Sequence, residues 1–173
     1  MIRILHQIFR TGILTEPLSK SEAEIREVGT RLEEAIRKKF RRSLTIRQVD
    51  AGSCNGCELE IHAINNSIYN CEMYGIHFTA SPRFADMLLV TGPVTRNMEI
   101  ALRRTYNATP TPKLVVAVGD CGCNGGIFGE SYASLGGVDK VIPVDCFISG
   151  CPPTPMHLLN GILKSVDKFT LFR

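Results

Sequence analysis

Cysteine is the residue type in this sequence that is best suited to chemistry. Cys54 and Cys57 form a Cys-x-x-Cys pair, Cys121 and Cys123 flank a glycine, and Cys151 precedes two prolines. Seven cysteines, an odd number, without a recognisable export signal argue against a disulfide framework and favour metal binding. Thiolates suit an iron–sulfur cluster or zinc, and the single Cys-x-x-Cys pair favours the cluster, since zinc sites usually combine two close pairs. A thioredoxin-like reactive pair is a third interpretation, against which the other cysteines argue.

The remaining cysteines are predicted to have other roles. Cys71 precedes a predicted strand and Cys146 lies inside one, so both are interpreted as buried packing residues. Cys121 and Cys123 compete for one ligand position. The place of Cys121 at the end of a predicted strand, with Gly122 behind it, favours Cys121.

The elements that must position these cysteines alternate between strands and helices. Apolar runs predict strands at 44–49, 76–80, 85–90, 114–118 and within 141–148, and helices at 57–67, 95–108 and 154–168. This alternation predicts an α/β fold, a flavodoxin-like, doubly wound, mostly parallel sheet that is covered on both faces. Ligands in such folds lie beyond the carboxyl ends of the strands, where the glycine-rich cysteine stretches are expected.

Residues 1–43 are predicted to form an N-terminal arm and an amphipathic basic helix, ahead of a [4Fe–4S]-binding domain over 44–173. A capping box at 19–22 and apolar residues at helical spacing predict the helix. The arm at 1–18 is interpreted either as packing on a neighbouring chain or as a disordered terminus. The basic run at 37–42 either complements the helix dipole or contacts an anionic membrane surface or an acidic partner.

Composition argues against several classes of function. The net charge of +3 is too small to indicate nucleic-acid binding, and no apolar run is long enough for a transmembrane helix. No glycine-rich nucleotide-binding loop follows a predicted strand.

A set of short stretches gives the sequence a recognisable likeness. They are residues 52–60, 81–86, 91–95, 119–121, 136–140, 143–145 and 150–153. Together they resemble the small-subunit family shared by [NiFe] hydrogenases and the 20 kDa subunit of complex I. Complex I subunits place their first two cysteines side by side, whereas Cys54 and Cys57 have the hydrogenase spacing. Without a long C-terminal extension, the sequence is most similar to the membrane-bound, energy-converting hydrogenase and formate hydrogenlyase small subunits.

The resemblance implies one proximal [4Fe–4S] cluster with the ligands Cys54, Cys57, Cys121 and Cys151. It implies no catalytic residue in this chain, which would be an electron-transfer subunit of a membrane-bound, ion-translocating [NiFe]-hydrogenase-type complex. The implied partners are a large catalytic subunit, a ferredoxin-like two-cluster subunit and membrane-arm subunits. The implied location is peripheral, on the cytoplasmic face of the cell membrane.

Two other functions stay open: the equivalent subunit of a complex-I-like quinone oxidoreductase or sulfur-reducing complex, and a zinc-stabilised interaction module. Glu58, Glu60 and Arg83 are candidates for a proton relay or for tuning the cluster. The rival interpretation of the glutamates is a helix-start carboxylate that complements the helix dipole. For Arg83 the alternatives are a place near the cluster, a contact with the partner, or a structural ion pair with Asp86.

Overall fold

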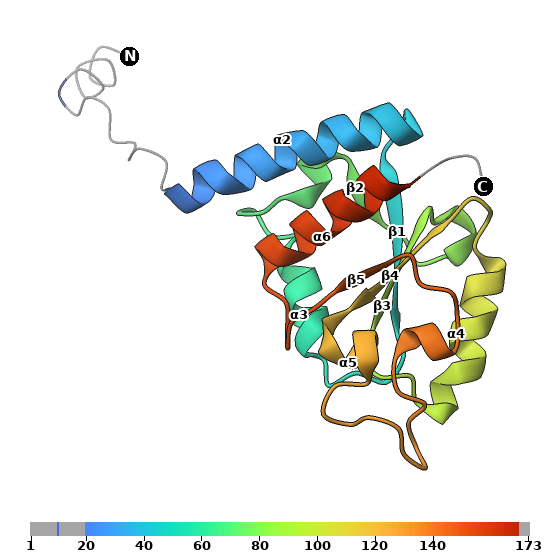
Figure 1. Cartoon of the computed structure of the whole chain (residues 1–173). Helices are drawn as coiled ribbons and strands as arrows, with labels where there is room; N and C mark the ends of the chain where they lie inside the picture. Colours follow the sequence, from blue (N-terminus) through green and yellow to red (C-terminus); the bar gives the residue numbers. More distant parts are fainter. Residues whose placement is uncertain (1–9, 11–19, 170–173) are drawn as a thin grey trace.

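A computed structural model gives the structure of residue 10 and of residues 20–169, so the predicted arm at 1–18 lies outside the described residues apart from Arg10. The centre is a sheet of five parallel strands in the order β2-β1-β3-β4-β5 (Figure 1). The strands are β1 (Leu44–Asp50), β2 (Ile76–Phe78), β3 (Met87–Thr91), β4 (Leu114–Val118) and β5 (Cys146–Ile148). This is the strand order of flavodoxin-like, doubly wound folds, so the predicted α/β fold is confirmed.

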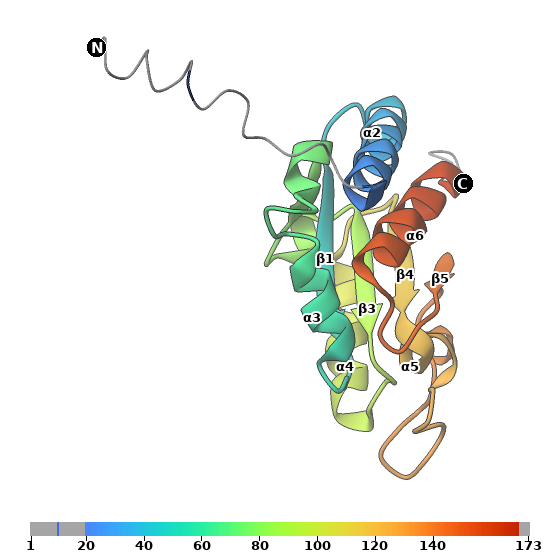
Figure 2. The same ribbon diagram turned by 90° about the vertical axis from the view of Figure 1, so that its left-hand side faces the viewer.

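Helices cover both faces of the sheet. Every residue of β3 and β4 is buried, as expected for parallel strands that are packed on both sides. One face is covered by α2 (Lys20–Phe40), α3 (Gly56–Ala63) and α6 (Pro155–Lys168), and the other by α4 (Arg96–Ala108) (Figures 1 and 2). Each face has its own apolar core. No helix in the described part of the chain is long and apolar enough to cross a membrane.

The structure differs from the sequence prediction chiefly after β4. A short helix, α5 (Gly119–Asn124), begins directly at the end of this strand, where a glycine-rich loop was predicted. Its sequence, GDCGCN, has two glycines and no apolar periodicity, so it lacks the pattern by which amphipathic helices are predicted. The predicted strand at 76–80 ends at Phe78, and the helix predicted at 57–67 ends at Ala63.

Helix α2 is fixed to α6 by its carboxyl end. The Lys39 Nζ donates hydrogen bonds to the carbonyl oxygens of Asp167 and Phe169, at 3.3 and 2.9 Å. The Phe40 ring stacks on the Phe169 ring, with centroids 5.2 Å apart. A positive charge at the last carbonyls of a helix is favourable, so Lys39 stabilises the end of α6 as well as that of α2. Part of the predicted basic run therefore has a structural role.

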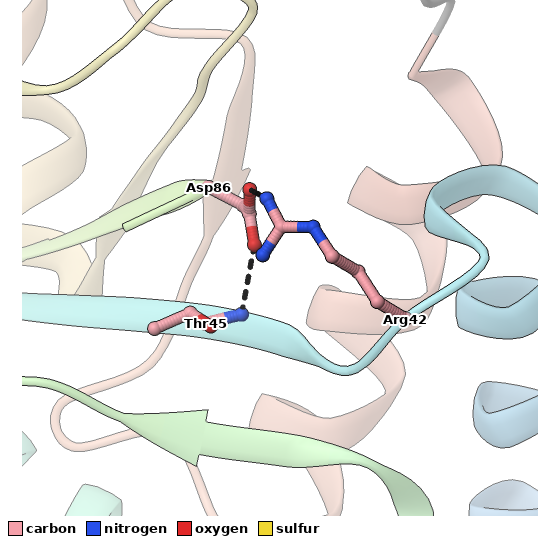
Figure 3. A network of polar contacts seen from close by, with 3 residues as sticks. All are labelled: Arg42, Thr45 and Asp86. Carbon is pink, nitrogen blue, oxygen red and sulfur yellow. Dashed lines mark hydrogen bonds and ion pairs between the residues drawn. The ribbon is translucent and has the colours of Figure 1, made fainter. Parts of the chain in front are cut away.

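Asp86 joins the first residues of the sheet to the segment that follows α2 (Figure 3). Its Oδ1 accepts a hydrogen bond from the Arg42 Nη2 at 2.6 Å, and its Oδ2 accepts one from the Thr45 N–H at 3.1 Å. The Asp86 N–H donates to the Thr45 carbonyl oxygen, and the Asp86 carbonyl oxygen accepts from the Leu114 N–H. One buried aspartate thus connects β1, β3 and β4 at their amino ends.

We expect Asp86→Ala to lower the free energy of unfolding by about 2 kcal/mol, because it leaves the Thr45 N–H without its acceptor and removes the partner of Arg42. Urea denaturation of the anaerobically purified chain, followed by circular dichroism, measures this change. The control is Arg37→Ala, whose ion pair with Glu33 is exposed at 4.0 Å and should contribute less than about 0.5 kcal/mol. Equal stabilities of the two variants would contradict the role given to Asp86.

Candidate metal centre

Three connections at the carboxyl edge of the sheet carry cysteines (Figure 1). Strand β1 leads through residues 51–55 into α3, and Cys57 lies in the first turn of this helix. Strand β4 leads directly into α5, which contains Cys121, and β5 leads into α6 through a loop that contains Cys151. Because parallel strands end at the same edge of a sheet, cysteines that are far apart in the sequence come together here.

The thiols of these connections lie close enough for their charges to interact. Burial, followed by the charges of Glu58, Cys54, Cys121 and Cys151, raises the pKa of the Cys57 thiol to about 12. Burial also raises the pKa of Cys121, and the charges of Cys151 and Cys54 raise it further. The structure thus brings together the four cysteines that the resemblance named as ligands, with Cys57 and Cys121 buried and Cys54 and Cys151 exposed.

Cys123 has different surroundings. Its Sγ lies 3.7 Å from the Ile148 carbonyl oxygen, at the end of β5, and 4.0 Å from the Ala117 carbonyl oxygen in β4. Burial and then the charge of Asp120 raise its pKa to about 11, and the neighbouring thiol that raises it is that of Cys146. Cys121, rather than Cys123, is therefore the residue of this pair that the structure brings to Cys54, Cys57 and Cys151.

Cys71 and Cys146 lie in the apolar core on the α2 and α6 side of the sheet, as predicted. The Cys71 Sγ donates a hydrogen bond to the Asn65 Oδ1 at 2.8 Å, which satisfies a thiol that is fully buried. Both cysteines serve packing.

Two glycines let the backbone lie directly against the buried thiols. A Cβ atom at Gly119 would lie 2.5 Å from the Cys57 Sγ, and one at Gly126 would lie 2.7 Å from the Cys121 Sγ. Both glycines have a positive φ, +80° and +53°, which side chains rarely tolerate. Because neither glycine has a side chain, space remains beside these two sulfurs. A bulky group held by the thiols would require such space.

Two aspartates that the sequence analysis did not identify shape the cysteine connections. The Asp120 Oδ1 accepts a hydrogen bond from the Gly150 N–H at 2.8 Å, and the Asp120 N–H donates to the Gly150 carbonyl oxygen at 2.9 Å. This pair of bonds, the Asp120 clamp, ties the residue before Cys121 to the residue before Cys151. Asp50 Oδ1 accepts from the N–H groups of residues 52 and 53, ahead of Cys54, at 2.7 and 2.8 Å. The signal that sequence reasoning could have used is an aspartate at a strand end followed closely by glycine, a pattern typical of side chains that bond to nearby backbone.

Glu58 and Glu60 lie on α3, directly after Cys57. Glu58 is only 5% exposed, and neither of its carboxylate oxygens has a hydrogen-bond partner among the described residues. Glu60 is half-buried. Burying a carboxylate without a hydrogen-bond partner costs free energy. Glu58, rather than Glu60, is therefore the residue that requires a further polar or charged neighbour.

Arg83 lies at the other end of the sheet. It belongs to the turn Pro82–Phe84 that precedes β3, and it lines a pocket with Arg42, Asp86 and Phe169. Because β3 runs from this turn towards the cysteines, Arg83 is separated from them by the length of the strand. The partner of Asp86 among the described residues is Arg42, not Arg83. Two predictions for Arg83, a place near the cysteines and an ion pair with Asp86, are therefore wrong.

The donor set consists of thiols alone, which suits a [4Fe–4S] cluster or zinc. A [4Fe–4S] cluster bonds each of its thiolates to a different iron, so its ligands surround a cube and not a single ion. Among the described residues, no group of three or more His, Cys, Asp or Glu side chains is placed to bind a single metal ion. The thiols of the three connections, with glycine backbone against two of them, fit the cluster.

Comparison with known proteins identifies relatives over most of the chain. Residues 54–165 match the family described as NADH ubiquinone oxidoreductase, 20 Kd subunit. Formate hydrogenlyase subunit 7 of Escherichia coli is 45% identical over 132 residues, which are 76% of this chain and 52% of that protein. A probable membrane-bound hydrogenase subunit of Pyrococcus furiosus is 43% identical over 127 residues, which are 73% of this chain and 76% of that protein.

A solved structure contains a chain with a similar fold. A chain in the structure of the membrane-bound sulfane sulfur reductase, an archaeal respiratory membrane complex, is 38% identical and superposes with a TM-score of 0.65. The match covers 79% of this chain and 74% of that chain.

The matched region begins at Cys54 and includes Cys57, Cys121 and Cys151. The chain spans about half of the formate hydrogenlyase subunit, 52% of its length. The names of these proteins are those of a formate hydrogenlyase subunit, a probable membrane-bound hydrogenase subunit and a respiratory membrane complex, which agrees with the resemblance that the cysteine stretches indicated. The chain belongs to the family of the 20 kDa subunit of NADH:ubiquinone oxidoreductase.

Proposed function

We propose that this chain holds one [4Fe–4S] cluster on Cys54, Cys57, Cys121 and Cys151. Through this cluster it would pass electrons to the active site of a large catalytic subunit, in a membrane-bound, ion-translocating complex of the [NiFe]-hydrogenase type. The observation that carries the proposal is the meeting of these thiols at the carboxyl edge of the sheet. When bound, such a cluster supplies one-electron chemistry.

The surroundings of the thiols support a role in holding a cluster. Cys57 lies in the first turn of α3, where the helix dipole stabilises negative charge. The Ile127 N–H donates a hydrogen bond to the Cys121 thiol, which lowers the pKa of that thiol against the effect of burial. Hydrogen bonds to cluster sulfurs and burial are the means by which a protein sets the cluster potential. Glu58, with its buried carboxylate beside Cys57, and Glu60 stay proposed as tuning or relay residues.

The exposure of the thiols supports electron exchange with a partner. Cys57 and Cys121 are buried, whereas Cys54 and Cys151 are exposed. A cluster on these ligands would therefore have one side against the domain and the other at the surface. The proposed partners are the large catalytic subunit, a ferredoxin-like two-cluster subunit and membrane-arm subunits, with the chain attached peripherally at the cytoplasmic face of the membrane.

A second candidate is the same electron-transfer role in a sulfur-reducing or quinone-reducing complex. The observation that favours it is the match to a chain of the sulfane sulfur reductase complex. The two candidates differ in the catalytic subunit and not in this chain. A zinc-stabilised interaction module is the alternative of another class, and metal and sulfide analysis separates it from both.

We expect Cys54→Ala and Cys151→Ala to remove about four irons and four sulfides per chain from the complex, together with one EPR signal, because each ligand holds one iron of the cube. The complex is purified anaerobically through a tag on this chain, and iron, acid-labile sulfide, nickel and zinc are measured. Both thiols are exposed, so their truncation spares the core.

The matched controls are Cys71→Ala, Cys146→Ala and Cys123→Ala, which should keep the iron and sulfide content of the unchanged complex. Nickel in the same preparation would support the hydrogenase, and iron with sulfide but no nickel would support the second candidate. Zinc without sulfide would overturn the cluster proposal.

The Asp120 clamp gives a second prediction. Asp120→Ala removes the acceptor of the Gly150 N–H, and we expect iron to be released to a chelator about tenfold faster, because groups that orient metal ligands typically affect metal affinity by this amount. Asp120→Asn keeps an acceptor oxygen and should release iron at a rate closer to that of the unchanged chain. Equal rates for Asp120→Ala and the unchanged chain would show that the clamp does not hold the ligand connections.

A further inference from the structure

Arg47, in β1, carries a buried hydrogen-bond donor that has no acceptor. Its Nε is buried and has no partner among the described residues, and none of the ion pairs in the described part of the chain includes Arg47. Glu58, which also has buried polar atoms without a partner, does not pair with it. A buried N–H of a charged group that lacks an acceptor costs free energy. Arg47 therefore requires an acceptor from elsewhere.

The space next to Arg47 arises from a step in the sheet. Strand β2 ends at Phe78, which pairs with Ile46, whereas β1 continues to Asp50. Beyond the end of β2 lies a pocket of about 250 Å³, the Arg47 pocket. It is lined by Arg47 and Gln48 of β1, by His62 in α3 and Asn65 after it, and by residues 78–80.

The lining of the Arg47 pocket favours an anion. None of the described residues that line it is acidic, and Arg47 gives it a permanent positive charge. The Asn65 Oδ1 already accepts a hydrogen bond from the Cys71 Sγ at 2.8 Å, so the amide nitrogen of Asn65 remains as a donor. A guanidinium presents its N–H groups in a fork that matches the two oxygens of a carboxylate. A carboxylate thus fits this pocket in charge and in shape.

The carboxylate has to come from outside the described residues. The acidic residue of β1, Asp50, uses its Oδ1 to accept hydrogen bonds from the N–H groups of residues 52 and 53. A free anion would lose its translational freedom on binding to a single arginine, whereas a side chain of a subunit that is already bound loses much less. Arginine is enriched among the residues that dominate protein interfaces. A neighbouring subunit is therefore the favoured source of the carboxylate.

We propose that the Arg47 pocket receives an aspartate or glutamate side chain of a neighbouring subunit, whose carboxylate accepts hydrogen bonds from the Arg47 guanidinium. The inference rests on the proposed function in one respect, the presence of other subunits around this chain. The test has to distinguish four other occupants. They are a free inorganic anion, a lipid phosphate, a second copy of this chain, and Glu16, the one acidic side chain of this chain outside the described residues.

A photo-crosslinking amino acid at Ala80, an exposed residue of the pocket lining, identifies the occupant in the complex purified through a tag on this chain. We expect crosslinks to a peptide of another subunit that contains aspartate or glutamate. Crosslinks confined to lipid, to a second copy of this chain or to residues 1–19 of the same chain would overturn the proposal.

The variant Arg47→Met removes the charge and keeps an apolar stem. We expect the crosslinked subunit to dissociate at least about tenfold faster, because removing one partner of a buried charge pair acts mainly on the dissociation rate. Native mass spectrometry after transfer into about 0.5 M salt, which screens exposed charges, measures this rate. The matched control is Arg104→Met, whose arginine is exposed on α4, and its rate should equal that of the unchanged complex. Equal rates for Arg47→Met and the unchanged complex would contradict the proposal.

A double-mutant cycle separates the pairing from a change in packing. The acidic residue found by crosslinking is changed to its amide, alone and together with Arg47→Met. We expect the double variant to dissociate no faster than Arg47→Met alone, because both changes remove the same contact. Effects that combine independently overturn the pairing, and so does Glu16→Gln if it accelerates dissociation as much as Arg47→Met.

A free anion is tested with inorganic phosphate, which should leave the thermal stability of the unchanged complex the same. A stabilisation by phosphate that Arg47→Met abolishes would show a site for a free anion and overturn the proposal. Iron and sulfide are measured on the same preparations. A complex without a cluster refutes the proposed function, whereas the dissociation rates decide separately on the Arg47 pocket.

Discussion

The common direction of the strands is the constraint on which the rest of the structure depends. All the strand pairs are parallel, so β1, β4 and β5 end at one edge, and the elements that follow them meet there. Without this arrangement, Cys54 and Cys151 would have no reason to be neighbours. The hydrogen bonds of Asp50 and Asp120 then act over short distances, on connections that the sheet has already placed.

Much of the fold could be predicted from the sequence, because the patterns that indicate strands and helices lie within short stretches of residues. Strand β4 was predicted with its observed ends, Leu114–Val118, since a continuous run of apolar, mostly β-branched residues is typical of a buried parallel strand. The place of the cysteines proposed as ligands, beyond the carboxyl ends of the strands, followed from the predicted parallel sheet. Helix α5 was missed because two glycines and two cysteines in six residues carry no helical periodicity.

What the sequence could not provide depends on contacts between distant residues. Arg83 follows a proline and precedes Asp86, so an ion pair between them was a reasonable hypothesis, yet the partner of Asp86 is Arg42, in the segment that follows α2. The choice between Cys121 and Cys123 depends on which thiol lies near Cys151. Residues two positions apart on a helix lie on different faces, and the sequence does not show which face is turned towards Cys151. The sequence likewise gave no sign that Ile127 and Tyr132 would project into water, because apolar residues in a glycine-rich segment could equally be buried.

Strand β1 lies outside the region that the family match covers, although it pairs with both β2 and β3. A fragment that begins at residue 54 would keep Cys54, Cys57, Cys121 and Cys151 but would lose β1, the strand through which β2 is joined to the sheet. It would also lose the Asp50 carboxylate that shapes the approach to Cys54. The region that the family match covers is thus shorter than the part of the chain that forms the sheet, so boundaries for truncated expression belong before Leu44 and not at the start of the match.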